Sequence, residues 1–116
     1  MTKVEVYGLA KCSTCRKALA HLDAKRISYS FHDVKEVPVT EAQVAKWIAA
    51  LGGWERLVNR AGYTWRGLAV SERASLDDSK AVAFVLRHPS LIRRPLIQTP
   101  EGISVGFSEA VRSRLG

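Results

Sequence analysis

The spacing of apolar residues along the sequence changes twice within the first third of the chain. Lys3–Tyr7 alternates apolar and polar residues and ends at Gly8, which predicts a short strand. A helical period of i, i+3, i+4 and i+7 follows at Cys15, Ala18, Leu19 and Leu22. Ile27–Asp33 alternates again and predicts a second strand. A strand, a helix and a strand joined by a crossover of this length predict a parallel strand pair.

The middle of the chain, from residue 34 to residue 93, shows helix signals and no convincing strand. Thr40 and Gln43 form a capping box ahead of a helical apolar period, and Gly52–Gly53 marks its end. A short helical turn is expected over residues 54–59 and another over residues 90–92. Between them, Asp78 or Ser79 is expected to cap a further helix that ends before Pro89.

The C-terminal part returns to strand patterning. Residues 95–98 are apolar, residues 99–102 form a turn, and residues 103–107 alternate, which predicts a β-hairpin. Ser108 is expected to cap a last helix. The predicted order is therefore β-α-β, a helical block and β-β-α, in one domain over residues 1–116 without an internal linker or repeat.

Composition indicates the class of protein and the cellular compartment. The hydrophobic fraction of 47% and the charged fraction of 25% are those of an ordinary soluble globular protein. No segment approaches the roughly 20 apolar residues that a membrane helix needs. Met1–Glu5 has neither the apolar core nor the cleavage site of a signal peptide. We therefore expect a cytosolic monomer without a membrane partner, in a compartment where thiols stay reduced.

The net charge of +7 predicts attraction to anions. The basic residues are dispersed along the chain, and no aromatic-basic signature of RNA binding is present. We therefore interpret most of this charge as a solvated basic surface and expect no direct binding of nucleic acid. A small anion such as glutathione or an oxyanion, or an acidic protein surface, remains compatible with it.

The two cysteines of the chain form a C-x-x-C motif at the head of the first predicted helix. This position lowers the pKa of a thiol by roughly one to several units, because unpaired N–H groups and the helix dipole stabilise the thiolate. The helical period turns Cys15 toward the core and leaves Cys12 in the first-turn loop, where solvent reaches it. We expect Cys12 to attack and Cys15 to resolve. The flanking Lys11 and Arg16 would lower the thiolate pKa further.

Two alternatives to thiol chemistry follow from the same residues. The first is a pair of unreactive thiols with one of them packed in the core. The second is a zinc site, which needs about four ligands and would have to recruit two of the three histidines, His21, His32 and His88. Their spacing is not that of paired metal ligands, so we expect no metal and no bound cofactor.

The whole chain resembles the ArsC/Spx family of thioredoxin-fold proteins, which contains arsenate reductases, Spx transcriptional regulators and YffB-like reductases. The resemblance rests on the C-x-x-C motif after the first strand and on the runs 92–97 and 105–109. The runs 53–59 and 64–66 are most similar to the YffB-like branch. The family resemblance implies an α/β, thioredoxin-like fold with a four-stranded mixed sheet and a helical insertion at about residues 36–92, between strands 2 and 3.

The resemblance also implies a set of site residues. Cys12 matches the nucleophile, Arg94 matches an arginine before a cis-proline, and Pro95 matches that proline. An arginine there suits a carboxylate or an oxyanion, because its planar group donates two parallel hydrogen bonds. We include Lys11 and Arg60 among the expected substrate-binding residues, with Arg66 as the alternative to Arg60.

Two departures from the family pattern bear on function. Gly106 stands where arsenate reductases have a further arginine in the hairpin, so arsenate reduction is disfavoured. Cys15 is absent from many arsenate reductases and YffB-like proteins and is typical of Spx regulators. We therefore expect a thiol-dependent reductase that uses glutathione or a dithiol. The alternative is an Spx-like redox switch that binds the C-terminal domain of the RNA polymerase α subunit.

Overall fold

The computed structural model describes residues 4–115, and their contacts group the chain into two units. The sheet unit contains residues 4–37 and 94–115, and the helical unit is Pro38–Arg93. The helical insertion expected at about residues 36–92 therefore begins and ends within two residues of the observed unit. The expectation of a single domain over residues 1–116 stays a prediction. Lys3, expected in the first strand, and Met1 and Thr2 lie outside the described residues.

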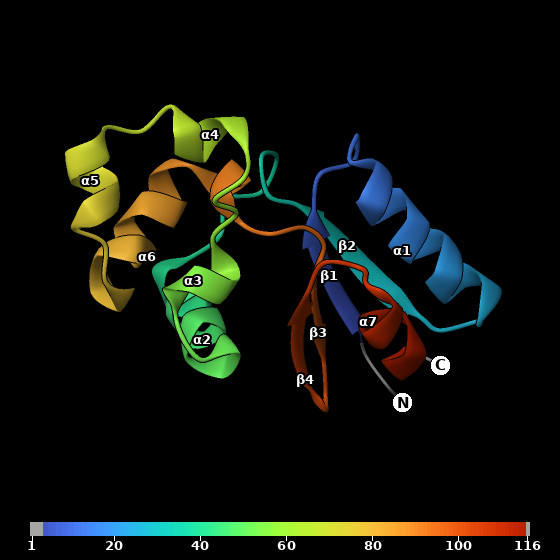
Figure 1. Cartoon of the computed structure of the whole chain (residues 1–116). Helices are drawn as coiled ribbons and strands as arrows, with labels where there is room; N and C mark the ends of the chain where they lie inside the picture. The colour runs from blue at the N-terminus through green and yellow to red at the C-terminus, as the bar shows by residue number, and fades with distance from the viewer. Residues whose placement is uncertain (1–3, 116) are drawn as a thin grey trace. The chain divides into compact units, whose positions relative to one another are not determined.

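The sheet unit holds a four-stranded mixed sheet in the order β2-β1-β3-β4 (Figure 1). Its strands are β1 (Val4–Gly8), β2 (Tyr29–Asp33), β3 (Leu96–Thr99) and β4 (Gly102–Val105). β1 pairs with β2 in parallel, while β1–β3 and β3–β4 are antiparallel. The predicted parallel pair, hairpin and four-stranded mixed sheet are confirmed. The strands are shorter than the alternating runs, and Ile27 and Phe107, which lie outside them, pack against the core as partly buried side chains.

Two helices pack on one face of this sheet. They are α1 (Ser13–Ala24) and α7 (Glu109–Arg114), and both contribute to one apolar cluster with β1 and β3. The fully buried members of this cluster include Val6, Ala18, Leu22 and Ile97. Removing a buried leucine such as Leu22 from such a cluster typically costs about 2–5 kcal/mol. The predicted helical period of α1 is confirmed, since its buried residues are Cys15, Ala18 and Leu22.

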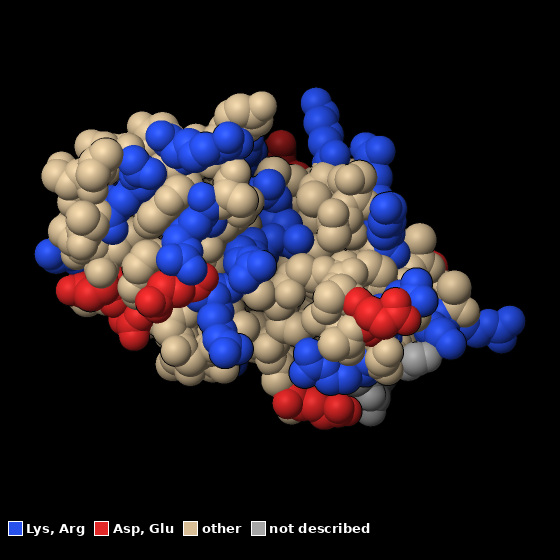
Figure 2. All heavy atoms as spheres, viewed as in Figure 1, with Lys and Arg blue, Asp and Glu red and all other residues tan. Residues whose placement is uncertain are grey.

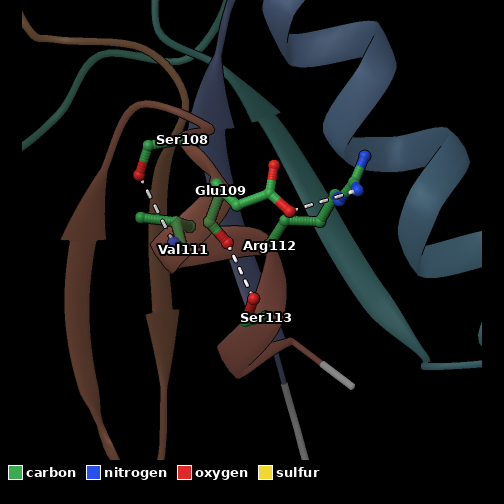
Figure 3. Close-up of polar contacts among 5 residues, drawn as sticks. All are labelled: Ser108, Glu109, Val111, Arg112 and Ser113. Atoms are coloured by element: carbon green, nitrogen blue, oxygen red, sulfur yellow. Dashed lines mark hydrogen bonds and ion pairs between the residues drawn. The ribbon is translucent and has the colours of Figure 1, made fainter.

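The start of α7 is fixed by its own side chains (Figure 3). The Ser108 hydroxyl accepts a hydrogen bond from the backbone N–H of Val111 at 3.4 Å, which confirms Ser108 as the helix cap. Glu109 forms an exposed ion pair with Arg112 at 3.7 Å. An exposed pair of this kind contributes little, so the apolar contacts of the helix with the sheet hold it in place.

The helical unit begins with the helix that the capping box predicted. α2 (Glu41–Leu51) has Thr40 as its cap, and the Thr40 and Gln43 side chains each accept from the other residue's backbone N–H. Gly52 ends the helix in the left-handed conformation, with φ of 87°. The remaining helices are α3 (Trp54–Leu57), α4 (Tyr63–Arg66), α5 (Val70–Ala74), α6 (Asp78–Arg87) and the 3₁₀ turn η1 (Pro89–Leu91).

The cap expected for α6 is wrong. Asp77 caps the helix by accepting a hydrogen bond from the backbone N–H of Lys80 at 2.7 Å. The Asp78 carboxylate instead accepts from the backbone N–H of Trp54 at 3.0 Å, at the start of α3. No helix within residues 4–115 has the length and apolar content needed to cross a membrane.

Candidate thiol active site

Cys12 is the residue that precedes the first turn of α1. It has extended backbone angles (φ −78°, ψ 121°), its N–H donates to Leu9 O at 3.0 Å, and its carbonyl accepts from the Arg16 N–H at 3.0 Å. The thiol is half-buried and does not cap the helix by a hydrogen bond. It therefore lies beside N–H groups that a helix leaves unpaired at its start and that stabilise a negative charge.

The surroundings of Cys12 lower the pKa of its thiol. Partial burial raises this pKa, but the backbone and side chain of Cys15, the Arg94 guanidinium and the backbone of Thr14 together outweigh it. Each of these groups donates toward the sulfur and so favours its ionised form. The lowered pKa predicted from the helix-start position is thus found, with Arg94 from the other end of the chain as an additional cause.

Cys15 has the opposite character. Its side chain is 1% exposed and faces the core. Burial, together with the hydrogen bond to Cys12 and the charge on Cys12, raises the pKa of the Cys15 thiol to about 11. The site therefore combines a half-buried Cys12, whose surroundings favour its ionised form, with a sheltered Cys15 thiol that is protonated at neutral pH. The expected placement of the two sulfurs is confirmed, and their attacking and resolving roles stay predictions.

Gly8 makes room for the Cys15 thiol, which the sequence pattern did not reveal. A methyl group on Gly8 would lie 2.5 Å from the Cys15 Sγ, well inside the contact distance of the two atoms. Gly8 is the last residue of β1, and the alternating pattern predicts it only as a strand end. Its position directly before the C-x-x-C loop was the signal available in the sequence.

Arg94 and Pro95 enter the sheet unit immediately before β3. The Arg94–Pro95 peptide bond is cis, as the family resemblance implied. Pro95 is buried, and its carbonyl accepts a hydrogen bond from the N–H of Gly106 at 2.9 Å. The Arg94 guanidinium reaches the Cys12 sulfur. The structure therefore brings Cys12, Cys15, Arg94 and Pro95 together within one unit.

Lys11 and Arg60 are the other expected substrate-binding residues. Lys11 is adjacent to Cys12 in the chain and exposed to solvent. Arg60 belongs to the helical unit, where its guanidinium lies 5.8 Å from the centroid of the Trp54 ring. Arg66, the alternative, lies 5.0 Å from the ring centroid of Tyr63 in the same unit. A substrate-binding role for Lys11 and for Arg60 stays a prediction.

Asp33 is a second residue near the motif that the sequence did not single out. One of its carboxylate oxygens accepts a hydrogen bond from the backbone N–H of Ala10 at 3.0 Å, and the other accepts from Lys35 N–H at 2.9 Å. These two backbone donors lower the pKa of Asp33, which is therefore ionised at neutral pH. Asp33 ends β2, so it connects the second strand to the loop before Cys12.

The basic residues of the chain are distributed over both units. Figure 2 shows lysines and arginines on both units of the face drawn, with acidic side chains in smaller groups between them. This distribution agrees with the dispersed charge seen in the sequence. It gives a small anion a favourable approach to either unit.

Comparison with known proteins places this geometry in a family. The sequence pattern of the ArsC family matches residues 7–114. A solved structure described as the YffB protein superposes with a TM-score of 0.90 at 36% identity, covering 97% of this chain and 99% of that one. These matches confirm the resemblance to YffB-like members and the thioredoxin-like α/β fold.

Two curated relatives extend the comparison. An uncharacterized protein of Haemophilus influenzae is 33% identical over 106 residues, covering 91% of this chain and 92% of the relative. The global transcriptional regulator Spx 1 of Lactococcus lactis is 25% identical over 107 residues, covering 91% of this chain and 83% of the regulator. The chain is thus similar both to the YffB protein and to Spx regulators.

Proposed function

From the membership of this chain in the ArsC family, we propose that it is a thiol-dependent reductase with Cys12 as its nucleophile. The observation that carries the proposal is the pair of opposite thiol environments, which favours a thiolate at Cys12 and a protonated thiol at Cys15. An accessible thiolate is the reactive form of cysteine toward disulfides. We place this activity in the cytosol, where glutathione is abundant, and expect a monomer.

The first step is attack by the Cys12 thiolate on a mixed disulfide between glutathione and a substrate thiol. A bond forms between Cys12 Sγ and the glutathione sulfur, and the substrate sulfur leaves with the electron pair and takes a proton from water. Cys12 is then held as a mixed disulfide with glutathione. The substrate has been reduced, and the oxidising equivalent resides on the enzyme.

Two routes regenerate the enzyme. In one, a second glutathione thiolate attacks the bound glutathione sulfur and releases oxidised glutathione and the Cys12 thiolate. In the other, Cys15 attacks Cys12 Sγ, its proton passes to the leaving glutathione, and two further glutathione molecules reduce the Cys12–Cys15 disulfide.

The environment of Cys15 changes when Cys12 is in the mixed disulfide. Two of the effects that raise the Cys15 pKa, the hydrogen bond to Cys12 and the charge on Cys12, depend on the Cys12 thiolate. Both are lost when Cys12 carries glutathione, so the pKa of Cys15 falls at the stage at which it is needed as a nucleophile. The burial of Cys15 persists, so part of the increase in its pKa remains.

Arg94 has two tasks in this proposal. It stabilises the Cys12 thiolate, and its guanidinium is suited to a carboxylate of glutathione or to another anionic group. Lys11 and Arg60 are proposed as further ligands of the anion. Arsenate is a disfavoured substrate, because Gly106 in the hairpin supplies no guanidinium to a tetrahedral oxyanion.

Turnover of a glutathione mixed disulfide tests the proposal. Reduced enzyme, glutathione and the disulfide of cysteine and glutathione are mixed, and oxidised glutathione is measured through NADPH consumption by glutathione reductase. We expect turnover above the uncatalysed thiol exchange. Absence of turnover by the unmodified enzyme, under conditions in which Cys12 in a separate sample of the same preparation reacts fully with iodoacetamide, would contradict the reductase proposal.

Replacement of Arg94 by glutamine separates its two tasks from general surface charge. Arg94→Gln is expected to lower kcat/KM by about 10- to 100-fold, because one charged hydrogen bond donor to the thiolate and the anion is lost. The matched control is Arg93→Gln, which removes the same charge from the exposed neighbouring residue. Equal losses in the two variants would mean that Arg94 acts only through net charge.

A second function is favoured by Cys15 and by the relatives named Spx. We propose as the alternative that the Cys12–Cys15 pair is a redox switch in a regulator that binds the C-terminal domain of the RNA polymerase α subunit. Binding of that purified domain is measured with reduced and oxidised protein. Redox-dependent binding at micromolar affinity together with absent turnover would favour the regulator.

A further inference from the structure

The two backbone polar groups of Ala10 are both held by side chains. Its N–H donates to an Asp33 carboxylate oxygen at 3.0 Å, and its carbonyl accepts from the Arg16 Nε at 3.0 Å. Asp33 is the last residue of β2, and Arg16 lies in the first turns of α1. The loop that leads to Cys12 is thereby tied to a strand on one side and to a helix on the other.

Within residues 4–115, the contacts described for Ala10 are those of these two side chains. Ala10 and Lys11 are both exposed, so burial does not fix their backbone. The neighbouring backbone hydrogen bonds hold the two ends of the loop: Val34 N–H donates to Gly8 O at 2.9 Å, and Cys12 N–H donates to Leu9 O at 3.0 Å. The side chains of Asp33 and Arg16 therefore supply the contacts that fix Ala10 itself.

We propose that Asp33 is a positioning residue for the Cys12 nucleophile, acting through Ala10 with Arg16 as its counterpart. Held in this way, the loop keeps the Cys12 sulfur against the N–H groups of Thr14 and Cys15 and beside Arg94. A loosened loop lets the sulfur move away from these donors. The inference rests on the proposed role of Cys12 as a nucleophile and adds the element that keeps it activated.

The sign of one pKa change separates positioning from a direct charge effect. Asp33 is an anion, so a direct effect of its charge on Cys12 would raise the pKa of Cys12, and removing the charge alone would lower that pKa or leave it unchanged. Loss of positioning has the opposite effect, because the thiolate loses its donors. Asp33→Asn removes the charge and leaves one acceptor oxygen for the two N–H groups that Asp33 now binds.

The experiment is the pH dependence of Cys12 alkylation by iodoacetamide, in wild type and in Asp33→Asn. We expect the apparent pKa of Cys12 to rise in the variant by about 0.5–1 unit, which is a roughly three- to tenfold smaller thiolate fraction below the pKa. Asp33→Ser, which also lacks the carboxylate, is a second variant and is expected to shift in the same direction.

The matched control is Asp77→Asn. Asp77 also accepts a backbone hydrogen bond, from Lys80 N–H at 2.7 Å, but it lies in the helical unit. The thermal midpoint of the Asp77→Asn variant is expected to fall, while the pH dependence of its Cys12 alkylation stays unchanged. An unchanged or lowered Cys12 pKa in both Asp33 variants overturns the positioning role. An ordinary pKa in the wild type overturns the proposed function instead, so the two failures are distinguishable.

Discussion

Cys12→Ser is expected to abolish turnover of a glutathione mixed disulfide, with a loss on the order of 10³-fold or more. A serine hydroxyl remains protonated at neutral pH and forms no disulfide, so the first step has no nucleophile. The fold should be retained, since Cys12 is half-buried and its side chain is not used as a helix cap. The coupled glutathione reductase assay measures the loss, and the thermal midpoint checks the fold.

Cys15→Ser is the informative partner of this variant. The first step needs only Cys12, so this variant should still take up glutathione, and mass spectrometry should detect one glutathione on Cys12. Turnover then continues only by attack of free glutathione. Full activity in Cys12→Ser, or glutathione uptake at Cys15 in that variant, would contradict the assigned division of labour.

Gly8→Ala is expected to destabilise the protein by on the order of 1–3 kcal/mol, the usual cost of overpacking. The added methyl group would lie 2.5 Å from Cys15 Sγ and 3.6 Å from Phe31 Cε1, so the thiol is the atom that must move. Displacement of Cys15 should also slow closure of the Cys12–Cys15 disulfide. Chemical denaturation gives the stability change, and thiol quantification during oxidation gives the closure rate.

A double-mutant cycle identifies the clash as the cause. Cys15→Ala removes Sγ and leaves the new methyl group of Gly8→Ala 3.5 Å from the Cβ of residue 15, an ordinary contact. The double variant should therefore lose less stability than the sum of the single variants. Gly62→Ala is the control, because its methyl group would meet the movable Asn59 side chain. Additive losses in the cycle would mean that Gly8 matters for a reason other than Cys15.

The sequence predicted the parts of the fold that repeat over several turns or residues. The apolar period of α1 correctly predicted that Cys15 faces the core. The capping box at Thr40 and Gln43 correctly predicted the start of α2. The helices α4 and α5 were not foreseen, because elements of four and five residues are too short to display a period. The cap of α6 was assigned wrongly, because Asp77 and Asp78 are equally good caps by residue type and only the contact with Trp54 distinguishes them.

The site shows a similar division between local and long-range contacts. The helix-start position of Cys12 was predictable from adjacent residues, and the effect on its pKa follows from the geometry of a helix end. The contacts of Arg94 with Cys12, of Gly8 with Cys15 and of Asp33 with Ala10 depend on strand pairing between β1, β2 and β3. The family resemblance supplied Arg94, whereas Gly8 and Asp33 needed the structure.

The most direct test of the central claim is the rate of iodoacetamide alkylation of each cysteine between pH 4 and pH 11, with peptide mapping to separate Cys12 from Cys15. We predict that Cys12 titrates below the ordinary cysteine value of about 8.5 and reacts first at neutral pH. Cys15 should stay unmodified until the pH approaches about 11. A Cys12 pKa at or above 8.5, or equal labelling of both thiols at pH 7, would contradict it.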